Sequence, residues 1–208
     1  MSETNIDLST ISTRQLAVEL AKRPDLPTLV RPDGLLDPEI WPIRPALGAI
    51  TCVDSIAVKR RHSCVYGAVI RRNTGKFSSR LAFIGGVVAK YESYDKAVER
   101  HWRDDLNLRV NLLTRWKYPL CAQQYAPQID LVNQLGFCED PGKHATAINY
   151  AVLIENEHEL RFGTKIGGQE ACALEWHSEE TCPPEEEWGY NARTPFLELL
   201  NRVKSYTF

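Results

Sequence analysis

Three side chains in the segment RHWRDDLNL have the types and spacing of a cation site: His101, Asp104 and Asp105. If the segment is helical, positions i, i+3 and i+4 share one face, so the three side chains project into one patch. Neighbouring carboxylates that are partly removed from water repel each other, and a bound divalent cation reverses that interaction. The cluster therefore indicates binding of Mg²⁺ or Mn²⁺. The alternative is a solvated helix face on which Arg100 and Arg103 pair with the acids.

The element that must carry this cluster is a helix that follows Ser93. An apolar stripe recurs along it every fourth residue and can anchor it to a sheet, through Tyr94, Val98, Trp102 and Leu106. The apolar stretch LAFIGGVV precedes the helix and contains two glycines, Gly85 and Gly86. The pattern predicts a strand that ends at the glycines, and then a helix whose acidic edge borders its buried stripe.

The rest of the chain predicts further strands and a closing helix. Short apolar segments rich in β-branched residues are expected to form strands at 46–58, 64–71, 112–123, 148–156 and 171–177. The segment 192–206 is expected to be a helix with Pro195 in its first turn. Strands on both sides of a central helix, followed by a second helix, predict an α/β protein with a mixed β-sheet sandwiched by helices.

The first 45 residues differ from the rest. A modest helical signal covers 9–22, and six prolines then fall within the 22 residues from Pro24 to Pro45. Proline at this density forbids a continuous helix or a central strand, so an extended arm is expected. We expect residues 1–45 to form this helix and proline-rich extension, and residues 46–208 to form one domain. The arm, which contains Trp41, is expected to support a homodimer.

The composition is that of an ordinary globular protein. Of 208 residues, 43% are apolar and 25% charged, and the net charge is −2, whereas nucleic-acid binders are more often basic. No apolar run approaches the roughly 18 residues of a membrane span, and the first residues lack a signal-peptide pattern. We therefore expect a cytoplasmic protein that binds neither nucleic acid nor membrane. Six cysteines without a CxxC pair argue against zinc-ribbon and thioredoxin sites and predict buried free thiols.

Counting from Gly86 gives a longer pattern: five residues lead to Glu92, seven more lead to Arg100, and HWRDDLNL follows. This spacing resembles the Nudix box, GX5EX7REUXEEXGU with U an apolar residue. In that family a strand, a loop, a helix and a second loop hold a divalent cation on a substrate diphosphate. The glycine, the first glutamate and the arginine keep their places here, as do Trp102 and Leu108.

The departures from the box are specific. His101 stands in place of a glutamate, Asp104 and Asp105 in place of paired glutamates, and Asn107 in place of a glycine. Asparagine is the commonest non-glycine residue at left-handed backbone positions, so the last change is mild. Aspartate is one methylene shorter than glutamate, so a metal must lie nearer the helix or bind through water. Imidazole is a poorer partner than carboxylate for Mg²⁺.

Within the Nudix superfamily the chain is most similar to the GDP-mannose mannosyl hydrolases. Those enzymes also lack the glutamate that follows the arginine of the box, at the position of His101 here. The segments 149–154, 170–176 and 191–200 look like later segments of those enzymes, and the resemblance covers about residues 40–200. It implies a Nudix-like α/β/α sandwich. It also implies metal ligands from the carbonyl of Gly85 or Gly86 and from the carboxylates of Asp105, Asp104 and Glu170.

Further site residues are expected in the box itself and in the segments around it. The expected catalytic residues are Asp104, Asp105, Arg100 and His101. Substrate contacts are expected from Arg71, Arg72, Arg80 and Trp188, the last in a polar loop. Ala171 stands where those hydrolases have a catalytic histidine, and Val87 stands where they have an arginine. The base is therefore open between His144, His177 and a carboxylate from a loop.

The resemblance implies a Mg²⁺- or Mn²⁺-dependent hydrolase of a nucleoside diphosphate linked to another group, with a nucleotide sugar favoured. Water attack at phosphorus and attack at the sugar carbon both remain open. The alternative is a degenerate Nudix domain that binds a nucleotide or a protein partner without turnover. His101 and Ala171 favour this alternative, whereas Asp104, Asp105 and Glu170 oppose it.

Overall fold

The structure is a computed structural model that describes residues 50–113, 120–127, 138–140, 144–165 and 168–205, with the side chains of 164–169 excepted. The predicted N-terminal helix and proline-rich arm lie outside these residues. Apart from 89–91, the described residues belong to one compact unit, which is formed by residues 49–88 and 92–208.

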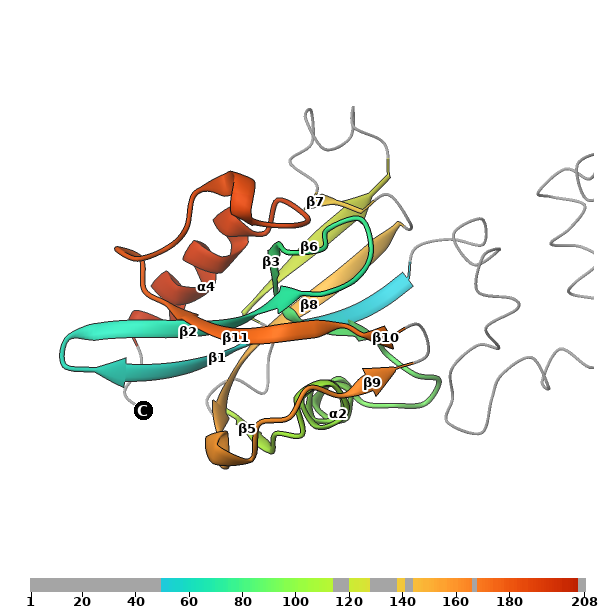
Figure 1. Ribbon diagram of the computed structural model, residues 1–208, viewed down its shortest axis with the longest axis horizontal. Coiled ribbons are helices and arrows are strands. Elements are labelled where there is room, and N and C mark those ends of the chain that lie inside the picture. The colour runs from blue at the N-terminus through green and yellow to red at the C-terminus, as the bar shows by residue number, and fades with distance from the viewer. Residues whose placement is uncertain (1–49, 114–119, 128–137, 141–143, 166–167, 206–208) are drawn as a thin grey trace, which may run out of the picture. The chain divides into compact units, whose positions relative to one another are not determined.

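The centre of this unit is one curled β-sheet (Figure 1). Its main path has the order β11-β2-β1-β8-β6-β7. The bounds of these strands, in chain order, are β1 Ile50–Arg61, β2 Cys64–Arg72, β6 Cys121–Ala126, β7 Cys138–Glu139, β8 Ala145–Ile154 and β11 Ala171–His177. β1 pairs antiparallel with β2 and parallel with β8, which confirms the predicted mixed sheet.

Shorter elements complete the described part of the chain. β3 (Leu81–Ala82), β4 (Ile84–Val87) and β5 (Val110–Leu112) pair with β2, β1 and β8 respectively. β9 (Thr164–Lys165) and β10 (Gly168–Gln169) form a separate pair. The helices are α2 (Tyr94–Leu106) and α4 (Arg193–Lys204), with 3-10 turns η5 (Glu157–Glu159) and η6 (Glu185–Glu187). The apolar stretch LAFIGGVV is thus two strands, because its halves pair with different neighbours.

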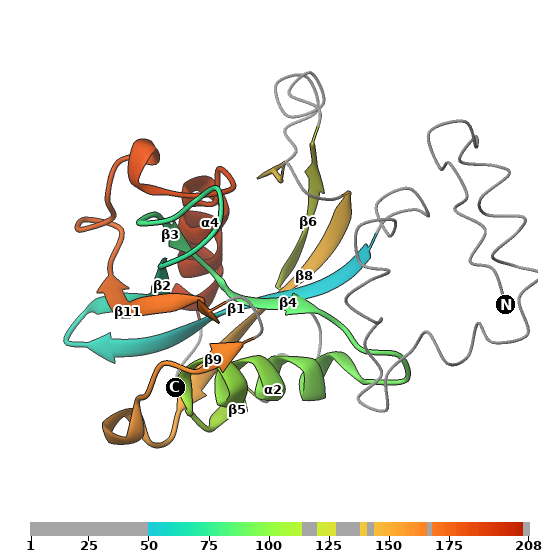
Figure 2. The same cartoon turned by 45° about the vertical axis from the view of Figure 1, so that its right-hand side comes forward.

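The two helices cover opposite faces of the sheet, as Figures 1 and 2 show. Val53 and Ala57 of β1 pack in the core under α2, whereas Ile56 and Val58 pack in the core under α4. Successive strand residues point to opposite faces, so a strand covered on both sides must be apolar at nearly every position. This explains the unbroken apolar run in the sequence and confirms the α/β/α sandwich.

Local signals fix the ends of α2. The Ser93 hydroxyl accepts a hydrogen bond from the Lys96 N–H at 3.4 Å, which caps the first turn. Asn107 ends the helix in the left-handed conformation, with φ 56° and ψ 31°. This conformation confirms that asparagine can replace the glycine of the box at this position.

A buried hydrogen-bond relay fixes the middle of α2 to the sheet. The indole N–H of Trp102, which has no exposed surface, donates to the Ser55 hydroxyl at 2.8 Å. The Ser55 hydroxyl in turn donates to the Ile84 carbonyl at 2.9 Å. The helix, β1 and β4 therefore keep a fixed register beside the glycines that follow Ile84.

Two further sequence predictions can be compared with the structure. None of the six cysteines, all of which lie in the described residues, forms a disulfide, as predicted, but only Cys52 and Cys138 are buried, and Cys172 is exposed. Among the helices of the described residues, none is long and apolar enough to cross a membrane.

Candidate functional site

Both glycines of β4 lie where a side chain would collide with a neighbour. A Cβ on Gly85 would overlap the Val53 carbonyl oxygen and lie 2.6 Å from Oδ1 of Asp54. A Cβ on Gly86 would lie 2.8 Å from Cε1 of His101. β4 therefore approaches β1 on one side and α2 on the other, and the absence of side chains makes room for the imidazole of His101.

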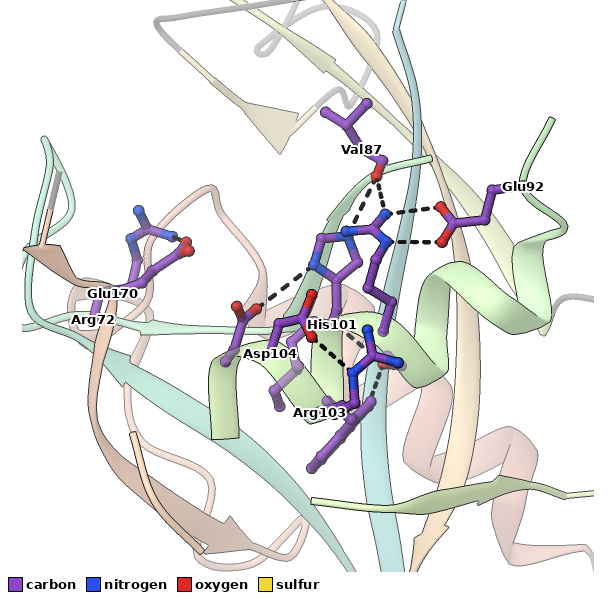
Figure 3. Close-up of polar contacts among 12 residues, drawn as sticks. Arg72, Val87, Glu92, His101, Arg103, Asp104 and Glu170 are labelled. Carbon is purple, nitrogen blue, oxygen red and sulfur yellow. Dashed lines mark hydrogen bonds and ion pairs between the residues drawn. The ribbon is translucent and has the colours of Figure 1, made fainter. Parts of the chain in front are cut away.

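His101 is buried between Gly86 of β4 and Asp105 of α2, with 5% of its surface exposed. Its Nε2 lies 3.4 Å from the Val87 carbonyl oxygen, and its Nδ1 lies 3.6 Å from Oδ2 of Asp105 (Figure 3). Nδ1 is buried and has no hydrogen-bond partner among the residues that the structure describes. A buried polar nitrogen without a partner is costly, so this atom calls for a physical explanation.

Arg100 joins α2 to the segment before it and to β4. Its Nε and Nη2 donate to the two carboxylate oxygens of Glu92, at 2.7 and 2.8 Å, and Nη2 also donates to the Val87 carbonyl at 2.8 Å (Figure 3). The hydrogen bonds that Arg100 donates to Glu92 raise the pKa of Arg100. Arg100 and Glu92, two residues of the box, therefore hold each other rather than a ligand.

The two aspartates of α2 differ in their surroundings. Asp105 is buried, with 6% of its surface exposed, and lies beside His101. The Asp104 side chain is 41% exposed and pairs with Nε of Arg103 at 2.9 Å. The predicted single patch is therefore divided, because the helix turns Asp105 toward the sheet and Asp104 toward solvent. In this structure Asp104 therefore lies on a solvated helix face, where it pairs with Arg103.

Glu170 is engaged by an arginine. Its Oε1 accepts from Nη1 of Arg72 at 2.8 Å, and Figure 3 shows this pair apart from the His101 and Asp104 side chains. Within the ranges that the structure describes, no three His, Cys, Asp or Glu side chains are grouped so that they could hold a metal ion. The structure thus does not assemble Asp104, Asp105 and Glu170 as a three-carboxylate cage.

The divalent cation implied by the sequence does not require such a cage. Mg²⁺ keeps several waters and is commonly bound by one or two carboxylates together with substrate phosphates. Asp105 supplies a buried carboxylate, and the orphaned Nδ1 of His101, whose ring packs against Gly86, lies next to it. These residues fit a cation that completes its coordination with a diphosphate.

The predicted substrate arginines have three different environments. Arg71 is occupied by Glu175 and Glu187 and by the Ser79 carbonyl, at distances of 2.5 to 3.2 Å. Arg80 is exposed and donates to the Trp188 carbonyl at 3.3 Å. The Arg72 guanidinium lies 5.4 Å from the Tyr190 ring centroid. Arg72 therefore makes a cation–π contact with Tyr190.

The position of Trp188 corrects the prediction of a ligand contact. Only 1% of Trp188 is exposed, and its ring centroid lies 4.9 Å from that of Phe196 on α4. The indole N–H donates to the Pro183 carbonyl at 3.2 Å. The acidic loop is polar, but its 3-10 turn directs this ring under α4. Tyr190, two residues later, is partly exposed and packs at 4.5 Å from Phe77.

Asp54 lies beside the glycines of β4, although no sequence pattern singled it out as a site residue. The Tyr125 hydroxyl donates to Oδ2 of Asp54 at 2.9 Å, and Asp54 pairs in register with Gly85. Burial, together with the charge of Asp54, raises the pKa of Tyr125 well above its ordinary value. A carboxylate inside the apolar strand ITCVDSIAV was the available signal, because buried charges are rare without a partner.

Neither His144 nor His177, the two histidines considered as the catalytic base, has surroundings that mark it for that role. His144 is exposed, and its carbonyl accepts from the Ile50 N–H at 2.9 Å. Nε2 of His177 lies 3.3 Å from Oε2 of Glu175, which makes His177 part of the Arg71 network.

The chain is similar to known proteins in its fold, whereas no match is found for its sequence. No family model matches the chain, and no curated protein matches it either. Solved structures do match. A possible asymmetric diadenosine tetraphosphate hydrolase from Jonesia denitrificans is 19% identical, with a TM-score of 0.58 over 76% of this chain and 96% of that one. A UDP-X diphosphatase is 10% identical, with a TM-score of 0.54 over 88% and 71% of the two chains.

A third match is a MutT/nudix family protein from Enterococcus faecalis, 15% identical, with a TM-score of 0.50 over 75% of this chain and 62% of that one. The chain has the Nudix fold. The segment that resembles the Nudix box runs from Gly86 of β4, through α2, to the left-handed turn at Asn107. The box found by spacing therefore coincides with a strand, a helix and a turn, the order that the resemblance implied.

Proposed function

We propose that the chain is a Nudix-type hydrolase of a nucleoside diphosphate linked to another group, with Mg²⁺ or Mn²⁺ as cofactor and a nucleotide sugar as favoured substrate. The observation that carries this proposal is the buried Asp105 carboxylate, which the box helix holds beside His101, the residue that packs against Gly86 of β4. Two proteins of the same fold are named for phosphoanhydride chemistry, a possible diadenosine tetraphosphate hydrolase and a UDP-X diphosphatase.

The chain's own residues have separable tasks in this proposal. Asp105 holds the cation, with Asp104 and a carbonyl of Gly85 or Gly86 as the further protein donors. A bound cation of this kind neutralises the diphosphate and stabilises it as a leaving group. Arg100 acts as a positioning residue, because it fixes the Val87 carbonyl and Glu92 through three hydrogen bonds.

Arg72 and Glu170 restrain each other until an anionic substrate arrives. Nη1 of Arg72 donates to Oε1 of Glu170 at 2.8 Å, so this donor becomes available to a diphosphate, and this oxygen to a cation, when the ion pair opens. A diphosphate competes well for the guanidinium, since arginine binds phosphate oxygens in the same bidentate manner as a carboxylate. We therefore assign Arg72 to substrate binding ahead of Arg71, whose donors already serve two carboxylates and a carbonyl.

The test is a panel of nucleoside diphosphate sugars and dinucleotides, incubated with Mg²⁺, Mn²⁺ or Co²⁺, with products separated by charge. Attack at phosphorus releases a nucleoside monophosphate and a sugar phosphate, whereas attack at carbon releases the free sugar and the nucleoside diphosphate. Asp105→Asn should abolish turnover with the fold intact. Glu99→Gln is the matched control, because Glu99 is a 40% exposed carboxylate on the same helix that pairs with Lys96.

One observation favours a second function, a domain that binds a nucleotide without turnover. His101 occupies the place of an acid, and the described residues contain no three-ligand metal group. The same panel separates the two functions. Tight binding of one compound, unchanged in Asp105→Asn and without product, would establish the binder and refute the hydrolase.

The homodimer belongs to the same proposal. Residues 24–45 are rich in proline and contain Trp41, which suits packing on a second copy. Light scattering should give twice the mass of 23.6 kDa for the full chain and the monomer mass for a chain that begins at residue 46. Equal oligomeric states of the two chains would refute a role for the arm.

A further inference from the structure

We propose that His101 and Asp105 form a two-ligand site for a first-row transition-metal ion, such as Fe²⁺, Co²⁺ or Zn²⁺, in preference to Mg²⁺. This inference narrows the cation of the proposed function, given above as Mg²⁺ or Mn²⁺, to a transition-metal ion. It rests on the proposed function for the reaction, although cation binding is measured without turnover. In this site His101, which stands where the box has a glutamate, is itself a metal ligand.

The tautomer of His101 follows from its neighbour. The Val87 carbonyl oxygen is only an acceptor, and Nε2 faces it at 3.4 Å, the shorter of the two ring contacts, so we assign the ring proton to Nε2. In the neutral ring Nδ1 then presents a lone pair, and it points at the Asp105 carboxylate. A metal-binding histidine characteristically donates its other ring N–H to a backbone carbonyl, a carboxylate or water. Val87 meets that condition here.

The separation of the two side chains suits a bridging ion. Nδ1 and Oδ2 are 3.6 Å apart, beyond the range of about 2.7–3.2 Å for an N–H···O hydrogen bond. Two ligands that each lie about 2.1 Å from one metal, at the tetrahedral angle, are about 3.4 Å apart. The observed gap is therefore too long for good direct contact and close to the spacing of two ligands of one ion.

Burial strengthens the argument. The side chains of His101 and Asp105 are only 6% and 5% exposed, so water screens little of the repulsion between a lone pair and a carboxylate. A cation between them removes that repulsion and satisfies the orphaned nitrogen at once. With two protein ligands, the ion keeps open positions for water or phosphate oxygens, as catalytic metal sites do.

The donor set selects the metal. Imidazole nitrogen suits Zn²⁺, Fe²⁺ and their neighbours in the series, whereas Mg²⁺ prefers carboxylate, carbonyl and water oxygens. Replacing a carboxylate of the box by imidazole also removes a formal negative charge, which weakens binding of a hard cation most. The alternative is a doubly protonated His101 that forms an ion pair with Asp105 and binds no metal.

The experiment uses the full chain without a histidine tag, titrated calorimetrically with CoCl₂ and separately with MgCl₂. We expect Co²⁺ to bind at least about tenfold more tightly than Mg²⁺, and His101→Gln to lose on the order of tenfold or more in Co²⁺ affinity. His101→Glu should reverse the preference toward Mg²⁺. The control is His158→Gln, because Nε2 of His158 also lies 3.6 Å from a carboxylate, that of Glu159, but its side chain is 82% exposed.

Proton NMR of the Co²⁺-loaded protein gives a readout that a purely structural histidine cannot produce. The Nε2–H of a ligating His101 should appear as a hyperfine-shifted signal that exchanges in D₂O and is absent from His101→Gln. No shifted exchangeable signal, or equal Co²⁺ affinity of wild type and His101→Gln, overturns the site and leaves the ion pair. If His101→Gln does not fold, the wild-type spectrum alone decides. Co²⁺ binding without turnover on any substrate refutes the hydrolase and retains the site.

Discussion

Arg100 binds both carboxylate oxygens of Glu92, eight residues earlier in the chain, and the same guanidinium donates to the Val87 carbonyl. The Arg100 and Glu92 side chains are only 20% and 14% exposed. This pair connects the end of β4 with the segment just before α2. It therefore holds in place the helical turn of α2 that carries Arg100 and His101.

Breaking that pair should destabilise the protein. Glu92→Gln leaves a largely buried guanidinium without its counter-charge, so we expect a loss of about 2 kcal/mol in the free energy of unfolding. Urea denaturation measures it. Glu99→Gln removes an exposed partner of Lys96 instead and should cost less than about 0.5 kcal/mol. Equal losses in the two variants would contradict this account.

Ser55→Ala should cost more than its small change in volume suggests. The substitution leaves both the Trp102 indole N–H and the Ile84 carbonyl without their serine partner in the core, and an unmade buried hydrogen bond costs about 1–3 kcal/mol. Thermal unfolding followed by Trp fluorescence tests this expectation. Ser78→Ala, which removes an exposed hydrogen bond to the Asn73 carbonyl, should change stability by no more than about 0.5 kcal/mol.

Two glycine substitutions separate backbone strain from collision. Gly75 has φ 79° and its nearest neighbour would be 3.6 Å from a new Cβ, so Gly75→Ala should cost about 1 kcal/mol of strain alone. Gly86→Ala adds a collision with the His101 ring at 2.8 Å and should cost about 2–3 kcal/mol. Chemical denaturation gives both values, and Co²⁺ affinity should fall only in Gly86→Ala. A Gly75→Ala loss as large as that of Gly86→Ala would argue against the collision.

The interaction of Glu175 with Arg71 should make part of the stability depend on pH. Hydrogen bonds from Arg71 hold the pKa of Glu175 below its ordinary value of 4.5. A carboxyl whose folded pKa is lowered stabilises the protein above the unfolded pKa, and that contribution disappears as the pH falls through the folded pKa. The stability difference between wild type and Glu175→Gln should therefore be largest near pH 7 and shrink below about pH 4.5. A difference that is constant from pH 7 to pH 2.5 would contradict the prediction.

Features encoded by near neighbours were predictable from sequence. Ser93 caps α2 through a hydrogen bond three residues away, and Asn107 ends it through its own backbone conformation. The alternation of β1 between two cores was also visible, because both faces of the strand are apolar. These signals lie within a few residues of the feature they determine, so one sequence suffices to find them.

The misplaced residues depend on partners that are distant in sequence. Asp104 and Asp105 differ by one position, and only the packing of α2 on the sheet decides that Asp105 alone is buried. Trp188 lies in an acidic loop but packs on Phe196, and Glu170 meets Arg72, which comes 98 residues earlier. Periodicity reports which face a residue occupies, but not which side chain lies across from it.

The end of α2 is completed by residues that come long after it. The Gly163 N–H donates to the Asp105 carbonyl at 2.7 Å, and the Arg161 N–H donates to the Leu106 carbonyl at 3.0 Å. A Cβ on Gly163 would overlap the Asp104 carbonyl oxygen. Helix ends leave carbonyls that need such donors. The residues of the box therefore do not complete this helix end by themselves. In a foreign scaffold that lacks residues 161–163, the helix of the box would fray at the turn that carries Asp105.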